Sequence, residues 1–256
     1  LEIDSWQRLR ALAVQALQNA TQHTYLPLQQ VVSSVNESLG HLQERRQFKF
    51  KPQDFDIYKT ELEPVLQFRQ RAGISYVYLK KHYEDERFIE DTLRELVLRA
   101  QVKQRRPISP SFWKNALKEA SSPLNKLDPD RYERILSEQS EVCQRVFPKA
   151  MTVVCGAAGT GKTTIINAII QAIENAHGSS AAFKLLAPTG KAADRLRERT
   201  NKDAQTIHSF LMKKGWLNPH NMTFNSGGQR ESTYTTYIID EASMLDLPVL
   251  ATLFRA

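Results

Sequence analysis

The chain has 256 residues, of which 41% are hydrophobic and 25% are charged, a composition typical of a protein with a packed core. No apolar run approaches the roughly 20 residues that a membrane-spanning helix needs, and a start that carries Glu2 and Asp4 does not resemble a leader peptide. Two cysteines are too few for a disulfide framework, which favours a cytoplasmic protein, and the net charge of +7 permits a nucleic-acid partner without establishing one.

The first part of the chain, residues 1–134, is predicted to be a mostly helical N-terminal domain. Apolar residues recur there at the spacing of one helix face in three stretches. These stretches are 9–20, 31–42 and 88–100. The pairs Ser109-Pro110 and Asp128-Pro129 each combine an N-cap with a first-turn proline, and they predict two further helix starts. Residues 74–79, an apolar run, fit either a strand or a buried helix. These patterns predict a core and name no function.

After Met151 the pattern changes to short β-rich runs that alternate with helical segments. The predicted strands are 152–155, 183–187 and 237–240, and a last helix is expected over 247–256. Such alternation is typical of βαβ units on a parallel sheet, so residues 135–256 are predicted to form an α/β domain. In these sheets ligands bind beyond the carboxyl ends of the strands.

A glycine-rich run after the first of these strands has the pattern G-x-x-x-x-G-K-T and opens a helical segment. Its residues are Gly156, Ala157, Ala158, Gly159, Thr160, Gly161, Lys162 and Thr163. Glycines let backbone N–H groups face a phosphate, and the start of the helix adds positive potential. This P-loop predicts that Lys162 reaches the β- and γ-phosphates of ATP and that the Thr163 hydroxyl binds Mg²⁺. Thr164 adds a second hydroxyl beside the nucleotide, with a local hydrogen bond as its simpler role.

The last predicted strand delivers two carboxylates, Asp240 and Glu241, at its tip. A P-loop enzyme needs such groups to complete its magnesium site and to orient water. We expect Asp240 to hold Mg²⁺, mostly through water, and Glu241 to position and deprotonate the attacking water. An Asp-Glu pair after two isoleucines is common by itself, so this prediction depends on the P-loop upstream.

Three further runs flank the P-loop, and the acidic pair continues as DEASM-D over residues 240–246. The runs are LSEQ at 136–139, APTGKAA at 187–193 and TIHSF at 206–210. With the P-loop, and in this order, they resemble the motifs of RecD-like helicases, the 5′→3′ branch of helicase superfamily 1 that includes the phage Dda helicase. The resemblance covers residues 135–256. It implies a first RecA-like domain that couples ATP hydrolysis to translocation on single-stranded DNA and to duplex separation.

The resemblance also implies roles for single residues. Gln139, the last residue of LSEQ, is expected to read the edge of adenine. The residues expected to contact DNA are Pro188, Thr189, Gly190, Lys191, Thr206 and His208. Without its neighbours, APTGKAA is more simply explained as a strand-to-helix turn. His208 is expected either to touch DNA or to brace the ATP site against the DNA site, and alone it would be a satisfied, partly buried histidine.

Residues 213–235, between TIHSF and the last strand, are predicted to form a β-hairpin insertion with two strands around a glycine-rich turn at 226–229. In the helicases that the chain resembles, a hairpin at this place separates the strands of a duplex fork. Trp216, Phe224 and Tyr234 are candidates to touch the fork, and packing at the base of the hairpin is the alternative for each.

The family's next motif and its second RecA-like domain, which carries the arginine that completes the ATP site, are not in this sequence. We therefore expect a fragment of a longer helicase that by itself is weakly active or inactive. The alternatives are a non-helicase P-loop NTPase or kinase and a catalytically inert interaction module. A protein partner is expected for the helical front domain. The pathway stays open between DNA repair or recombination, replication and conjugation, as does the choice of DNA over RNA.

Overall fold

The structure is a computed structural model that describes residues 2, 4–21, 23–41, 48–118, 122–157, 159–178, 183–232 and 236–256. The chain divides into two compact units, Leu1–Phe88 and Ile89–Ala256, which are described separately below as the first and second units. None of the helices in the described ranges is long and apolar enough to cross a membrane.

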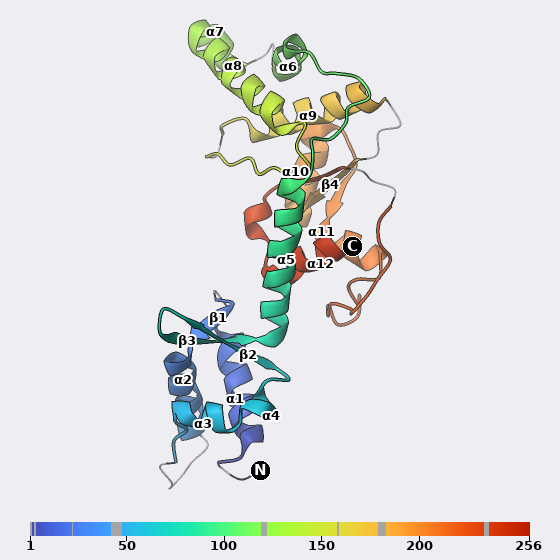
Figure 1. The fold of residues 1–256 in the computed structure, drawn as a ribbon. Coiled ribbons are helices and arrows are strands. Elements are labelled where there is room, and N and C mark those ends of the chain that lie inside the picture. Colours follow the sequence, from blue (N-terminus) through green and yellow to red (C-terminus); the bar gives the residue numbers. More distant parts are fainter. Residues whose placement is uncertain are drawn as a thin grey trace. The chain divides into compact units, whose positions relative to one another are not determined.

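The first unit packs helices against one face of a small antiparallel sheet (Figure 1). Its elements are α1 (Trp6–Asn19), β1 (Tyr25–Pro27), α2 (Leu28–Gly40), α3 (Pro52–Ile57), α4 (Lys59–Leu62), β2 (Leu66–Arg71) and β3 (Ile74–Leu79), followed by α5 (Lys80–Leu98), which continues into the second unit. The strand order is β1-β3-β2, and Ala72 and Gly73 take positive φ values in the two-residue turn between β2 and β3. The ambiguous run 74–79 is therefore a strand.

The predicted helical stripes of the first unit form its core. Leu9, Leu17, Val31, Val35 and Leu39 are among its buried residues, together with Val77 from the sheet. Leu42, the last residue of the second predicted stretch, lies outside the described residues. In the third predicted stripe Ile89 is buried, but Val97 is 70% exposed. The apolar periodicity of this stretch correctly predicts a helix, α5, but the last two turns of α5 do not bury an apolar face.

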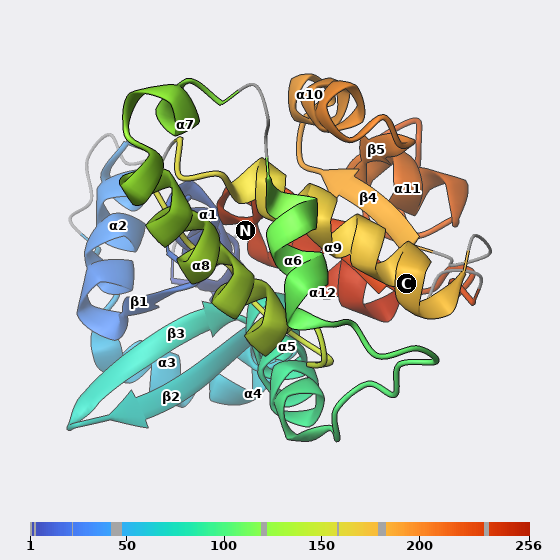
Figure 2. The ribbon, with the colours of Figure 1, turned by 90° about the horizontal axis from the view of Figure 1, so that it is seen from above.

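The second unit begins with helices that pack on the P-loop helix. Its elements are α6 (Pro110–Leu117), α7 (Pro123–Leu127), α8 (Pro129–Val146), α9 (Lys162–His177), β4 (Phe183–Ala187), α10 (Gly190–Thr200), β5 (Ala204–Thr206), α11 (Ile207–Lys213), β6 (Thr236–Ile239), the 3-10 turn η1 (Ala242–Met244) and α12 (Leu247–Arg255). Figure 2 shows α6 and α8 lying over α9, and Trp113, Leu136, Cys143 and Ile165 share one cluster there. The compact units thus divide at residue 88, whereas the sequence suggested a boundary near 134.

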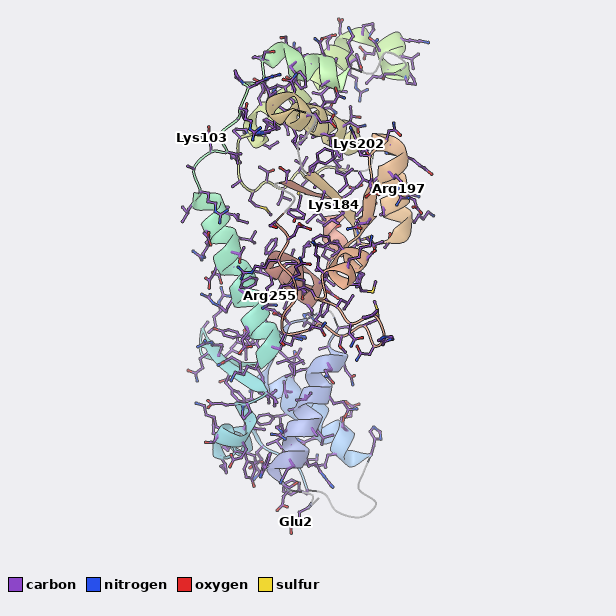
Figure 3. All side chains as sticks on the ribbon, turned by 90° about the vertical axis from the view of Figure 1, so that its right-hand side faces the viewer. Glu2, Lys103, Lys184, Arg197, Lys202 and Arg255 are labelled. Atoms are coloured by element: carbon purple, nitrogen blue, oxygen red, sulfur yellow. The ribbon has the colours of Figure 1, made fainter. Side chains whose placement is uncertain are left out.

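A parallel sheet of order β5-β4-β6 forms the centre of the second unit. Ala187 pairs with Thr206 and Leu186 with Ile239, so the carboxyl ends of all three strands meet at one edge. Figure 3 labels three basic side chains on or beside this sheet. Lys184 of β4 pairs with Asp203, and Arg197 of α10 donates to the backbone of Ala204. Lys202, just before β5, pairs with Glu174 of α9. A helical front followed by an α/β P-loop domain is the predicted fold class.

The strand predicted over residues 152–155 is not formed, and this expectation was wrong. The segment has no regular secondary structure, and Val153 is 73% exposed. A strand needs a hydrogen-bonded neighbour as well as β-forming residues, and no strand of the described sheet pairs with this segment. The segment leads into the P-loop as extended chain instead.

Candidate nucleotide and DNA site

The P-loop takes its shape from glycines in backbone conformations that other residues rarely adopt. Gly159 and Gly161 have φ values of +78° and +80°, and Gly161 is the residue that precedes α9. A Cβ on Gly156 would lie 2.7 Å from Oγ1 of Thr160. That hydroxyl donates to the carbonyl of Ala157 at 2.9 Å and closes the turn. Ala158, the remaining predicted loop residue, lies outside the described residues.

The ammonium of Lys162 is folded into this loop. Its Nζ donates to the carbonyl oxygens of Gly156 and Ala157, at 2.8 and 2.7 Å. An ammonium carries three hydrogen-bond donors and no acceptor, so it can exchange these carbonyls for phosphate oxygens without turning away from the loop. The structure therefore places the charge of Lys162 where the pattern predicts a phosphate contact.

Gln139, on α8, lies directly against the P-loop. Its Nε2 donates to the carbonyl of Thr160 at 3.2 Å, and a Cβ on Gly161 would be only 2.5 Å from that same nitrogen. The glycine at position 161 thus permits both the left-handed turn and the close approach of Gln139. The expected contact of Gln139 with adenine stays a prediction.

Thr163, in the first turn of α9, accepts a hydrogen bond that the sequence did not predict. Arg199 of α10 donates from Nη1 to Oγ1 of Thr163 at 3.1 Å, while its backbone carbonyl accepts from Nδ2 of Asn167 at 3.1 Å. A second positive side chain therefore stands beside the P-loop. Nothing local to residue 199 marks it, because it is one of several charged residues on an exposed helix and its partner is 36 positions away.

The tip of β6 holds the two predicted carboxylates. The N–H of Asp240 donates to Leu186 at 3.0 Å and extends the pairing with β4, and Oδ1 of Asp240 accepts from the N–H of Glu241 at 2.9 Å. Glu241 is exposed and has a φ of +54°, a left-handed conformation that costs a non-glycine residue free energy.

The remaining predicted residues meet at the same edge of the sheet. Thr189, after β4, accepts from the N–H of Ala192 and caps α10, while Gly190 and Lys191 beside it are exposed. Thr206, at the end of β5, accepts from the N–H of Ser209 and caps α11. The same edge also holds Pro188 and His208, which are half-buried.

Two groups of predicted residues are thus assembled. One contains the P-loop with Gln139, and the other contains the tips of β4, β5 and β6. In the described ranges, no hydrogen bond or ion pair joins Asp240 or Glu241 to the P-loop residues. The structure brings residues together within each group, and among the described residues no hydrogen bond or ion pair joins the two groups.

The donor atoms of Thr163 and Asp240 fit magnesium. Among the described residues there is no group of three or more His, Cys, Asp or Glu that could hold a metal ion. Magnesium is usually bound through one or two carboxylates together with water and phosphate oxygens, so a hydroxyl from Thr163 and a carboxylate from Asp240 are suitable donors.

The predicted hairpin insertion turns at a different place. Leu217 pairs with Phe224, so the chain turns within 218–223 and not at the glycine-rich run 226–229, and residues 213–232 contain no longer strand. Trp216 is buried, and its indole N–H donates to Gln229 at 2.9 Å. A Cβ on Gly228 would lie 2.7 Å from this ring, so a glycine there lets the backbone cross it.

The candidates for fork contact in this insertion have different outcomes. Trp216 belongs to a hydrophobic cluster of the second unit that also contains Leu186 and Phe210, and Phe224 packs against this cluster. Packing, which was the alternative for both, is what the structure shows. Tyr234 lies outside the described residues.

Comparisons with known proteins agree with the P-loop assignment. The AAA domain family matches residues 139–256. The RecBCD enzyme subunit RecD of Haemophilus influenzae is 29% identical to the chain over 161 residues, and the ATP-dependent RecD2 DNA helicase of Deinococcus radiodurans is 33% identical over 129 residues. These matches cover 54% and 50% of this chain. An uncharacterised protein of Methanocaldococcus jannaschii is 29% identical over 189 residues, which cover 68% of this chain. The chain spans only 16 to 24% of these relatives' lengths.

Proposed function

We propose that this chain, whose residues 139–256 form the helicase-like AAA domain of a RecD-like superfamily 1 helicase, binds ATP and couples its hydrolysis to movement along single-stranded DNA. The proposed movement is 5′→3′ and separates duplex DNA. The observation that carries the proposal is the P-loop, in which a left-handed glycine turn opens α9 and the Lys162 ammonium lies inside the loop.

Each residue of the ATP site has a proposed task. The N–H groups at the start of α9 and the Lys162 ammonium bind the β- and γ-phosphates, because both present positive charge to the same space. Thr163 and Asp240 hold Mg²⁺, which supplies charge neutralisation at the phosphates when it is bound. Glu241, exposed at the tip of β6, orients the attacking water and accepts its proton.

The proposed DNA path follows the common edge of β4, β5 and β6. Lys191 is exposed at the start of α10, and the hydroxyl of Thr189 keeps its O–H as a donor while its oxygen caps the helix. A lysine, a hydroxyl and helix-start N–H groups are typical ligands of backbone phosphates. A path along the tips of three adjacent strands would let DNA movement act directly on Glu241 at the end of β6.

The test measures ATP binding, ATP hydrolysis and DNA unwinding separately. In the 256-residue chain, Lys162→Ala is expected to lose affinity for a fluorescent ATP analogue and Glu241→Gln to retain it, because only Lys162 contacts phosphate in the ground state. In the full-length protein, single-stranded DNA is expected to stimulate hydrolysis, which a kinase or an inert module would not show. Duplexes with a 5′ tail are expected to be unwound in preference to those with a 3′ tail. Equal loss of nucleotide affinity in both variants would contradict the assigned roles.

A further inference from the structure

The small sheet of the first unit has one face that points away from its apolar core and is bordered by the start of α5. Because opposite residues of an antiparallel ladder lie on the same face, the pairing fixes both faces. Leu26, Val77 and Phe68 are opposite one another and belong to the core, so they mark the inner face. The outer face therefore carries the alternate positions. They are Tyr25 and Pro27 on β1, Ile74, Tyr76 and Tyr78 on β3, and Gln67, Arg69 and Arg71 on β2.

This outer face is aromatic, whereas the solvated face of an antiparallel sheet is usually polar. The rings of Tyr25 and Tyr76 are 5.3 Å apart, and those of Tyr25 and Tyr78 are 4.8 Å apart. Tyr83, on α5, extends the cluster and packs on Tyr78 at 5.3 Å. Tyr25 is 38% exposed and the other three tyrosines are half-buried. Four neighbouring rings thus form a partly exposed surface, which we call the tyrosine face.

The tyrosine face has positive charge along one border. Arg69 and Arg71 are alternate residues of β2 and therefore lie on the same face, and both are exposed. The guanidinium of Arg69 lies 4.6 Å above the ring of Tyr83. Burial raises the pKa of the Tyr78 hydroxyl, and the carboxylate of Glu86 on α5, which accepts a hydrogen bond from Thr24, raises it further. Two exposed cations, Arg69 and Arg71, therefore lie on the same sheet face as the tyrosines.

We propose that the tyrosine face binds single-stranded nucleic acid, with bases stacked on Tyr25 and Tyr76 and with Arg69 and Arg71 beside the phosphates. Single-strand binding surfaces combine rings on which bases stack with cations that follow the backbone, and both occur here on one sheet face. The inference rests on the proposed DNA substrate and adds a second contact, on a different unit from Thr189 and Lys191.

The experiment titrates a labelled oligo-dT with the 256-residue chain and follows fluorescence anisotropy. Tyr25→Ala and Tyr76→Ala are each expected to raise the Kd about fivefold or more, because one stacked base is worth about 1–3 kcal/mol. Tyr25→Phe and Tyr76→Phe keep the ring and are expected to retain wild-type affinity. Circular dichroism and thermal unfolding verify that each variant is folded.

Charge is tested separately on exposed residues. Arg71→Ala is expected to reduce the slope of log K against log salt by about 0.7, the value for one lost contact with a single strand. Lys49→Ala is the matched control, because Lys49 is an exposed cation of the same unit that lies outside the sheet. It is expected to leave the slope unchanged.

A Thr189→Ala/Lys191→Ala variant separates the two proposals. If DNA binding weakens with this variant and not with the folded tyrosine-to-alanine variants, the tyrosine face is not a nucleic-acid surface and the proposal is wrong, while the proposed function stands. A protein partner would then be the remaining candidate to bind the tyrosine face. If binding weakens only with the tyrosine variants, the tyrosine face is supported and the assigned DNA path along the sheet edge fails. Equal effects of Arg71→Ala and Lys49→Ala would also overturn the proposed phosphate contact.

Discussion

The packing of Gln139 on Gly161 can be measured by comparing two glycines of the same loop. Gly159 and Gly161 both have left-handed φ values near +80°, so alanine at either position costs about 1 kcal/mol of backbone strain. Around Gly159 a new Cβ meets nothing within 4 Å, whereas at Gly161 it would lie 2.5 Å from Nε2 of Gln139. The glutamine must then move and give up its hydrogen bond to Thr160, which is worth about another 1 kcal/mol.

We therefore expect Gly161→Ala to lower the free energy of unfolding by about 2 kcal/mol and Gly159→Ala by about 1 kcal/mol. Glycine also gives the unfolded chain more freedom than alanine, but this effect is the same in both variants and cancels in the comparison. Adding Gln139→Ala should cost about 1 kcal/mol in the wild type and almost nothing beside Gly161→Ala.

The assay is urea unfolding without nucleotide in a Trp6→Phe background. The remaining tryptophans, Trp113 and Trp216, both lie in the second unit, so their fluorescence reports on the unit that contains the P-loop. Equal destabilisation by the two glycine variants would refute the reasoning. So would full additivity of Gln139→Ala with Gly161→Ala.

Three further predictions concern single side chains of the second unit. Arg199→Ala removes a cation beside Thr163 and is expected to weaken ATP binding roughly two- to fivefold, measured by calorimetry in EDTA. The control Arg195→Ala, on the same helix, is expected to leave ATP binding unchanged. Burial raises the pKa of the Cys143 thiol to about 11. Iodoacetamide at neutral pH should therefore modify the exposed Cys155 and should not modify Cys143 until the protein unfolds. Peptide mapping by mass spectrometry measures the modification of each cysteine. Between pH 9 and 11 the thiol of Cys143 ionises in the unfolded chain but stays protonated in the folded protein, so the free energy of unfolding should fall as the pH rises. Urea unfolding of Cys143→Ala should not show this fall.

Features that depend on local chemistry were predictable from the sequence. Ser109 and Asp128 accept hydrogen bonds from Phe112 and Arg131 and begin α6 and α8 as the serine-proline and aspartate-proline pairs predict. In each case the residue type and its immediate neighbours supply the whole interaction, so no knowledge of the distant chain is needed.

Features that depend on distant partners were not predictable. The sheet of the first unit was missed because β2, with the sequence LQFRQR, is half polar and buries only one side. Residues 152–155 are as apolar as a buried strand, yet no neighbouring strand pairs with them. The contact of Arg199 with Thr163 gives no signal in the sequence around either residue. Each of these three features depends on contacts between residues that are far apart in the sequence.

The structure also bears on whether the threonines at the sheet edge serve the fold or the ligand. Thr189 and Thr206 both cap helices, which is the simpler of the two explanations of these motifs. A cap uses a lone pair of the hydroxyl oxygen to accept a backbone N–H, and the O–H hydrogen is then still available as a donor. A phosphate needs donors, and the helix start that the cap creates supplies N–H groups in the same place. Capping and phosphate binding therefore use different parts of one hydroxyl, so evidence for the cap does not count against a DNA contact.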